Sequence, residues 1–141
     1  MNVRPKKYLG QHFLTDLSVA QRIVDSLGST ARNVLEIGPG MGVLTQFLLQ
    51  RDDICLNVVE IDEESVDYLR EHYPQLASHL YSADFLQMDL ARIYGSEPFA
   101  LIGNLPYNIS SQIFFKVLDY RESVPEIVCM VQKEVAERIA S

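Results

Sequence analysis

Residues 34–42 read VLEIGPGMG, and this stretch decides the fold. Apolar residues typical of a buried strand lead into a turn with three glycines at alternate positions. Residues 43–49, VLTQFLL, follow with apolar side chains at helical spacing. Glycine allows the backbone to turn tightly and a ligand to approach it closely. The stretch therefore predicts a strand that enters a helix through a turn able to bind a ligand.

The alternation of strand and helix patterns continues along the chain. Further strands are predicted at residues 55–61, 80–83, 99–102 and 127–131. Helices are predicted at residues 16–27, 63–71 and 110–118, and from residue 133 onward. This order predicts an α/β fold, with a doubly wound, mostly parallel sheet covered by helices on both faces. In such a sheet, ligand sites lie at the carboxyl ends of the strands.

Composition limits the classes of partner. The 141 residues are 48% hydrophobic, and no apolar run approaches the roughly 18 residues of a membrane span, so we expect a cytoplasmic protein without a membrane partner. The net charge of −7 argues against a broad nucleic-acid surface. Arg4, Lys6 and Lys7 nevertheless precede the first acidic residue. They form either a solvated terminus or a basic arm that meets RNA phosphate.

Neither the cysteines nor the histidines show the spacing of a metal site. Cys55 and Cys129 lie in apolar, strand-like runs and are predicted to be reduced thiols in the core. His12, His72 and His79 have no ligand spacing with each other or with the cysteines. We therefore expect no bound metal.

Two acidic residues follow predicted strands next to the glycine turn. Glu60 ends the second strand about 20 residues after Gly38 and Gly40, where a carboxylate can accept both hydroxyls of a ribose. Asp84 follows the third strand and could accept a hydrogen from an adenine amino group. The glycines do not have the dinucleotide spacing, and no P-loop lysine follows them. A cationic nucleoside without phosphate, S-adenosyl-L-methionine, fits these residues.

A substrate motif follows the fourth strand. Asn104, Leu105, Pro106 and Tyr107 stand in sequence there. Pro106 keeps Leu105 extended and donates no hydrogen bond, so nearby carbonyls are free to face a ligand. The side-chain oxygen of Asn104 and a backbone carbonyl could accept the two N–H groups of an exocyclic amine and orient it toward a methyl donor. Tyr107 offers an aromatic face to an unstacked base.

Four segments together resemble the bacterial ribosomal RNA adenine dimethyltransferases: residues 7–14, 34–45, 104–107 and 131–135. The resemblance implies a Rossmann-like class I methyltransferase with strand order 3-2-1-4-5. It implies two methyl transfers to N6 of each of two adjacent adenosines near the 3′ end of small-subunit rRNA, in an assembling ribosomal particle. Cofactor contacts are implied at His12, Leu14, Gly38, Glu60, Asp84 and Asn104, and target-base contacts at Asn104 and Tyr107. The family pattern more often has Asn at the position of His12.

The resemblance also implies a division of the chain. Residues 1–15 form the basic arm and cofactor-side motif, and residues 16–141 form the S-adenosylmethionine-binding domain. The family continues with two more strands and a helical C-terminal domain, so we expect a truncated chain that binds cofactor but is catalytically impaired. The exposed fifth strand, residues 127–131, is expected to promote self-association, whereas the full-length protein is expected to be a monomer.

Two alternatives remain open from the sequence. One is a large-subunit rRNA adenine methyltransferase of the macrolide-resistance type, which shares most of these motifs. The other is a non-catalytic RNA-binding relative with the same fold.

Overall fold

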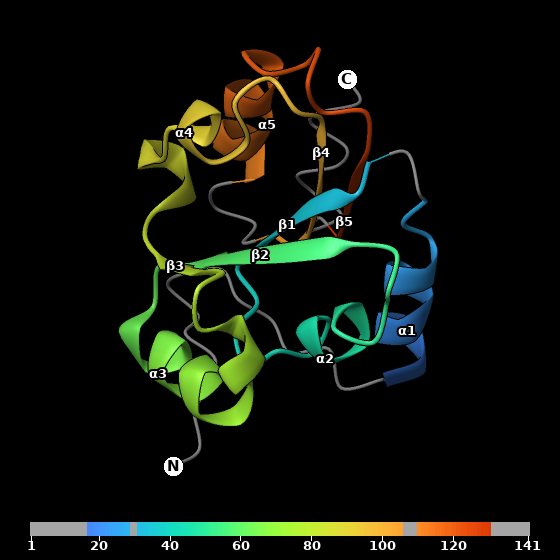
Figure 1. Ribbon diagram of the computed structural model, residues 1–141, viewed down its shortest axis with the longest axis vertical. Helices are drawn as coiled ribbons and strands as arrows, with labels where there is room; N and C mark the ends of the chain where they lie inside the picture. The colour runs from blue at the N-terminus through green and yellow to red at the C-terminus, as the bar shows by residue number, and fades with distance from the viewer. Residues whose placement is uncertain (1–16, 29–30, 106–109, 131–141) are drawn as a thin grey trace.

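The computed structural model describes residues 17–28, 31–105 and 110–130. They form one parallel sheet of five strands with helices on both sides (Figure 1). The strand order is β3-β2-β1-β4-β5, which confirms the predicted fold class and order. The strands are β1 (Asn33–Ile37), β2 (Cys55–Glu60), β3 (Leu80–Ser82), β4 (Phe99–Asn104) and β5 (Ile127–Met130). The α-helices are α1 (Leu17–Asp25), α2 (Thr45–Leu48), α3 (Glu63–His72), α4 (Leu90–Tyr94) and α5 (Ser110–Leu118).

Two short 3-10 helices, η2 (Pro74–Leu76) and η3 (Phe85–Gln87), and helix α4 were not predicted, because each is too short to show a helical period. The predicted helix over residues 43–49 is shorter in the structure. Gly42 has a φ of 84° and its N–H donates to the carbonyl of Pro39 at 2.9 Å, so turns occupy the residues before α2. The predicted cap of α3 is confirmed, since the Asp62 carboxylate accepts from the Ser65 N–H at 3.1 Å.

The sheet separates two hydrophobic cores, and β1 contributes to both. Val34 packs with residues of α1, α2 and α3 on one face, and Leu35 and Ile37 pack with residues of α4 and α5 on the other. Figure 1 shows these two groups of helices on opposite sides of the strands. Strand β1 lies in register with β2 on one side and β4 on the other. The turn after β1 is thus held at the centre of the carboxyl edge of the sheet.

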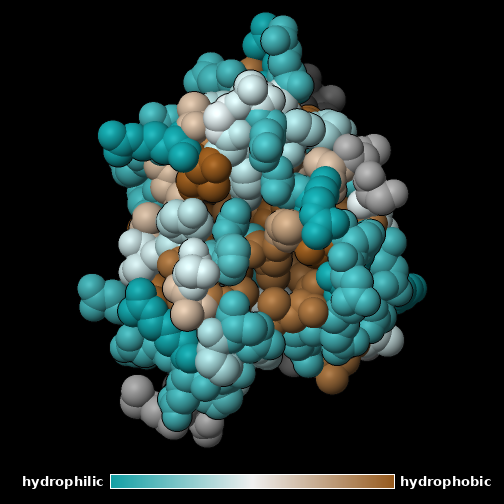
Figure 2. All heavy atoms as spheres, viewed as in Figure 1, coloured by the Kyte–Doolittle hydropathy of each residue, from teal (hydrophilic) through white to brown (hydrophobic). Residues whose placement is uncertain are grey.

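The prediction that Cys55 is a core thiol was wrong. Cys55 is exposed and Cys129 is half-buried. Strand β3 pairs with β2 only from Val58 to Glu60, so none of the described strands pairs with the beginning of β2 on that side. Figure 2 shows a largely polar face, with hydrophobic side chains visible in a central hollow in the region of β2. No helix in the described part of the chain combines the length and apolar character that a membrane crossing requires.

Gly103 provides a test of the close approach between β1 and β4. It is in register with Ile37, and a Cβ at this position would lie 2.5 Å from the Ile37 carbonyl oxygen. Gly103→Ala should therefore force the backbones apart and lower the free energy of unfolding by about 1–3 kcal/mol. Urea denaturation followed by circular dichroism measures the change. Gly28→Ala is the control, since its Cβ would meet only the flexible Glu126 side chain at 3.4 Å. Equal stability of the two variants would contradict this account.

Candidate functional site

The turn after β1 exposes backbone to the surroundings. Gly38 and Gly40 have φ values of 64° and 60°, a conformation that side chains with a Cβ rarely adopt. A Cβ at either position would have no atom of the described residues within 4 Å, so within this part of the chain the space beside both residues is open. Gly42 differs, because its Cβ would lie 2.7 Å from the ring of Tyr73. Gly42 thus serves packing, whereas Gly38 and Gly40 leave room for a ligand to approach the main chain.

Glu60 fastens this turn to the end of β2. Its carboxylate Oε1 accepts from the Gly40 N–H at 2.9 Å, and Oε2 accepts from the Asp62 N–H at 3.0 Å. Burial raises the pKa of the carboxyl, and the N–H donors of Asp62 and Gly40 lower it. The side chain is only 1% exposed. Each carboxylate oxygen keeps a further acceptor site, which suits a neighbouring hydroxyl group.

Glu36 is a second buried carboxyl beneath the turn. The hydroxyl of Thr45, at the start of α2, donates to its Oε1, and its Oε2 has no hydrogen-bond partner among the described residues. Burial raises the pKa of Glu36 to about 8, against the effect of the Thr45 hydrogen bond and with a further contribution from the charge of Glu60. The Glu36 carboxyl is therefore mostly protonated at neutral pH. From the sequence, Glu36 was predicted to be a strand residue and not a site residue.

Ile61 is an exposed apolar side chain at the same edge of the sheet. It follows Glu60 directly and is 51% exposed. Ile61 was predicted as a strand residue and not as a site residue. The sequence signal that could have revealed it is the helix cap at Asp62, because a strand that ends before this cap leaves Ile61 in the connection between β2 and α3. An apolar face beside Glu60 is suited to pack against a planar ring.

Asp84 follows β3 in the same row of strand ends. Its Oδ1 accepts from the Leu86 N–H at 3.0 Å and so caps η3. The connection from β3 is held close to β2, since the Ala83 N–H donates to the Glu60 carbonyl at 3.1 Å. The side chain of Asp84 is half-buried. The structure thus brings the predicted residues Gly38, Gly40, Glu60 and Asp84 to neighbouring strand ends.

Asn104 is the last residue of β4, and its backbone is in register with Met130 of β5. Only the backbone of Asn104 is described. The side chain of Leu105 is 4% exposed and packs in the core on the α4 and α5 side, so its backbone is the part able to meet a substrate. The remaining predicted site residues lie outside the described residues: Arg4, Lys6, Lys7, His12, Leu14, Pro106 and Tyr107.

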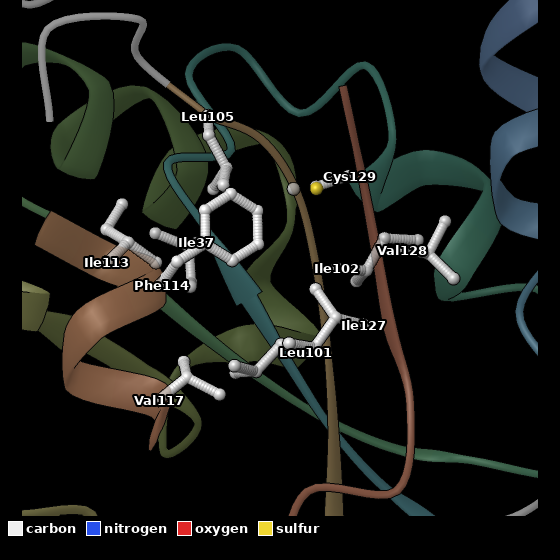
Figure 3. Close-up of a pocket in the computed structure, with 11 residues that line it drawn as sticks. Ile37, Leu101, Ile102, Leu105, Ile113, Phe114, Val117, Ile127, Val128 and Cys129 are labelled. Atoms are coloured by element: carbon white, nitrogen blue, oxygen red, sulfur yellow. The ribbon is translucent and has the colours of Figure 1, made fainter. Parts of the chain in front are cut away.

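A small apolar cavity lies behind the end of β4, between β4, β5 and α5 (Figure 3). Leu105, Ile113, Phe114 and Cys129 are among the residues that line it. Its volume is about 10 Å³, roughly the space that one water molecule needs. Burial raises the pKa of the Cys129 thiol, which favours the neutral form. The cavity is a packing defect too small for a nucleoside.

A family model described as ribosomal RNA adenine dimethylase matches residues 2–141. The chain belongs to this family. Among curated relatives, ribosomal RNA small subunit methyltransferase A of Bacteroides thetaiotaomicron is 58% identical over 140 residues, which are 99% of this chain and 52% of the relative. The protein of the same name from Porphyromonas gingivalis is 56% identical over 143 residues, covering 100% of this chain and 55% of the relative. The chain spans about half the length of the curated relatives it matches.

Solved structures of methyltransferases share the fold. The 23S rRNA methyltransferase ErmE superposes with a TM-score of 0.71 at 32% identity, covering 89% of this chain and 50% of that one. A dimethyladenosine transferase from Plasmodium falciparum superposes with a TM-score of 0.69 at 28% identity, covering 92% of this chain and 46% of that one. The residues of the strand-end site therefore lie on a methyltransferase fold.

The buried Glu36 carboxyl predicts a pH dependence of stability. Its pKa of about 8 in the folded protein exceeds the ordinary value of 4.5, so its contribution is fully present below pH 4.5 and is lost as the pH rises through 8. Glu36→Gln should remove this dependence, which is worth up to about 1.4 kcal/mol per pH unit in that window. Denaturant unfolding between pH 5 and 8 measures it. Glu71→Gln removes an exposed carboxylate as the control, and an unchanged slope in Glu36→Gln would contradict the assignment.

Proposed function

We propose that the chain is the cofactor-binding part of an S-adenosyl-L-methionine-dependent rRNA adenine dimethyltransferase. Its substrate would be N6 of two adjacent adenosines near the 3′ end of small-subunit rRNA, within an assembling ribosomal particle. The observation that carries the proposal is the Glu60 carboxylate, which joins the open glycine turn to the end of β2. The family match and the small-subunit names of the curated relatives support the choice of substrate.

The residues at the strand ends fit S-adenosyl-L-methionine. Within the described residues, Gly38 and Gly40 leave open space beside the main chain. Their positive φ values would strain any residue with a Cβ at these positions. Glu60 would accept from the ribose hydroxyls, Ile61 would pack on the adenine ring, and Asp84 would accept from its amino group. None of these described residues is a cation placed to neutralise phosphate. The acidic character of the site suits a ligand whose sulfonium and ammonium groups are positive.

In this proposal, the residues of the chain position the target base and its amino group for methyl transfer. When bound, S-adenosyl-L-methionine supplies an electrophilic methyl group. The side-chain oxygen of Asn104 and the carbonyl of Leu105 would accept the two N–H groups of the target amine, which orients the nitrogen lone pair. Tyr107 would stack on the extruded base. His12 and Leu14 would contact the cofactor from the N-terminal segment, residues 1–15.

Binding to the particle and assembly of the protein are further parts of the proposal. Arg4, Lys6 and Lys7 would meet rRNA phosphate and so give binding a salt dependence. The enzyme would act in the cytoplasm, and the full-length protein would be a monomer. Among the described strands, β5 pairs with β4 alone, so this chain would self-associate through β5. Residues 16–141 would form the cofactor domain.

Ile61 offers a test of cofactor binding that leaves the fold intact, because its side chain is exposed. Ile61→Ala should weaken S-adenosyl-L-methionine binding about fivefold, or about 1 kcal/mol, by removing apolar surface from beneath the adenine. Isothermal titration calorimetry measures the affinity. Leu17→Ala is the matched control, since Leu17 is 53% exposed and lies on α1. Equal loss in both variants, or no loss in either, would remove Ile61 from the site.

The assignment of Asn104 and Tyr107 is tested in the full-length enzyme. Asn104→Ala should lower the turnover number far more than the affinity for cofactor, since the amide orients the amine in the transition state. Tyr107→Phe keeps an aromatic face and should retain much of the activity, whereas Tyr107→Ala should not. Methyl transfer to assembling small-subunit particles is the measurement. A Tyr107→Ala enzyme with the parental rate would exclude a stacking role.

A further inference from the structure

Lys116 connects helix α5 to the segment that forms η3, which lies about 30 positions earlier in the sequence. It lies on α5 beside the buried residues Ile113 and Val117, and its side chain is half-buried. Its ammonium Nζ donates to the backbone carbonyls of Phe85 and Met88, at the two ends of the segment that forms η3. The same ammonium lies 5.1 Å from the centre of the Phe85 ring. One side chain thus binds the η3 segment by two hydrogen bonds and a cation–π contact.

The segment that Lys116 holds begins at Asp84. Asp84 caps η3 at its start, through the Leu86 N–H, while Lys116 satisfies carbonyls of the same segment. Burial lowers the pKa of Lys116, and the charges of Asp84 and Asp89 act in the opposite direction and favour its protonated form. Desolvation of the ammonium is unfavourable, and its hydrogen bonds and cation–π contact offset this cost.

The other end of this connection is helix α5, which follows β4 in the chain. Helix α5 begins at Ser110, six residues after Asn104 ends β4. Contacts between α5 and η3 otherwise come from apolar packing, in which Phe85, Ile113 and Val117 share one core. Apolar packing is non-directional and tolerates sliding, whereas two hydrogen bonds from one ammonium fix both the position and the rotation of the segment. Lys116 therefore fixes the η3 segment, which follows Asp84 directly, relative to α5.

We propose that Lys116 is a positioning residue that sets the selectivity of the site for a 6-amino purine. A carboxylate accepts a hydrogen from an adenine amino group and repels the carbonyl oxygen of a 6-oxo purine, provided that it is held at the ring edge. Lys116 holds the segment that carries Asp84, and its positive charge compensates that carboxylate. This inference rests on the proposed function, because it takes Asp84 to be the acceptor for adenine.

The test compares two nucleoside thioethers that differ only at position 6, 5′-methylthioadenosine and 5′-methylthioinosine. The unaltered chain should bind the adenosine compound at least about tenfold more tightly. In Lys116→Met this ratio should fall to about threefold or less, because the neutral side chain fills the same space without the two hydrogen bonds. Lys116→Arg, which keeps the charge and N–H donors, should recover much of the ratio. Arg92→Met removes an exposed cation from α4 and should leave the ratio unchanged.

The unaltered chain tests the adenine site at Asp84, and the Lys116 variants test the role of Lys116. If the unaltered chain binds neither compound, or both equally, the adenine site at Asp84 is wrong and the role of Lys116 falls with it. If the unaltered chain discriminates and Lys116→Met discriminates equally, or loses affinity for both compounds by the same factor, Lys116 supports only the fold and the inference is overturned. Should Lys116→Met fail to fold, Lys116→Leu, which likewise removes the charge and the N–H donors, carries the same comparison and is expected to lower the ratio.

Discussion

The carboxylate of Glu60 holds the turn after β1 against the end of β2, through hydrogen bonds from the amides of Gly40 and Asp62. The glycines of the turn adopt positive φ values, and Asp62, which donates to Glu60, also caps α3. One buried side chain therefore joins the glycine turn, the end of β2 and the start of α3. A ligand at this edge of the sheet meets a surface that is already formed.

The sheet makes this arrangement possible because β1 lies between β2 and β4, parallel to both. Its side chains enter the two cores alternately, which leaves Glu36 buried on the same face as Val34. A carboxyl at that place is tolerated because it is largely neutral, as its raised pKa shows. The polar groups of the site are thus concentrated at one edge, while the rest of the described sheet is packed with hydrophobic residues.

The parallel sheet and the positions of Gly38, Glu60 and Asp84 at strand ends could be predicted from the sequence pattern, and the strand order from the family resemblance. Alternating hydrophobic segments and glycine turns are local signals, and they agree with the fold here. The state of Glu36 could not be predicted in this way, because its burial and the lack of a partner for Oε2 within residues 17–28, 31–105 and 110–130 depend on tertiary packing. The contacts of Lys116 with residues about 30 positions earlier were hidden for the same reason. The exposure of Cys55 depends on the shortness of β3, which periodicity does not reveal.

The most direct measurement of the central claim is a ¹⁵N–¹H correlation spectrum of the chain during titration with S-adenosylhomocysteine. A cofactor site at the strand ends predicts that the largest shifts fall on the amides of Gly38 and of residues 40–42, 60–62 and 84–86, with Gly40 and Asp62 changing together because both donate to Glu60. Amides at the opposite edge of the sheet, such as those of Asn33 and Cys55, should change little. Saturable shifts centred on that opposite edge, or no shifts at all, would contradict the account.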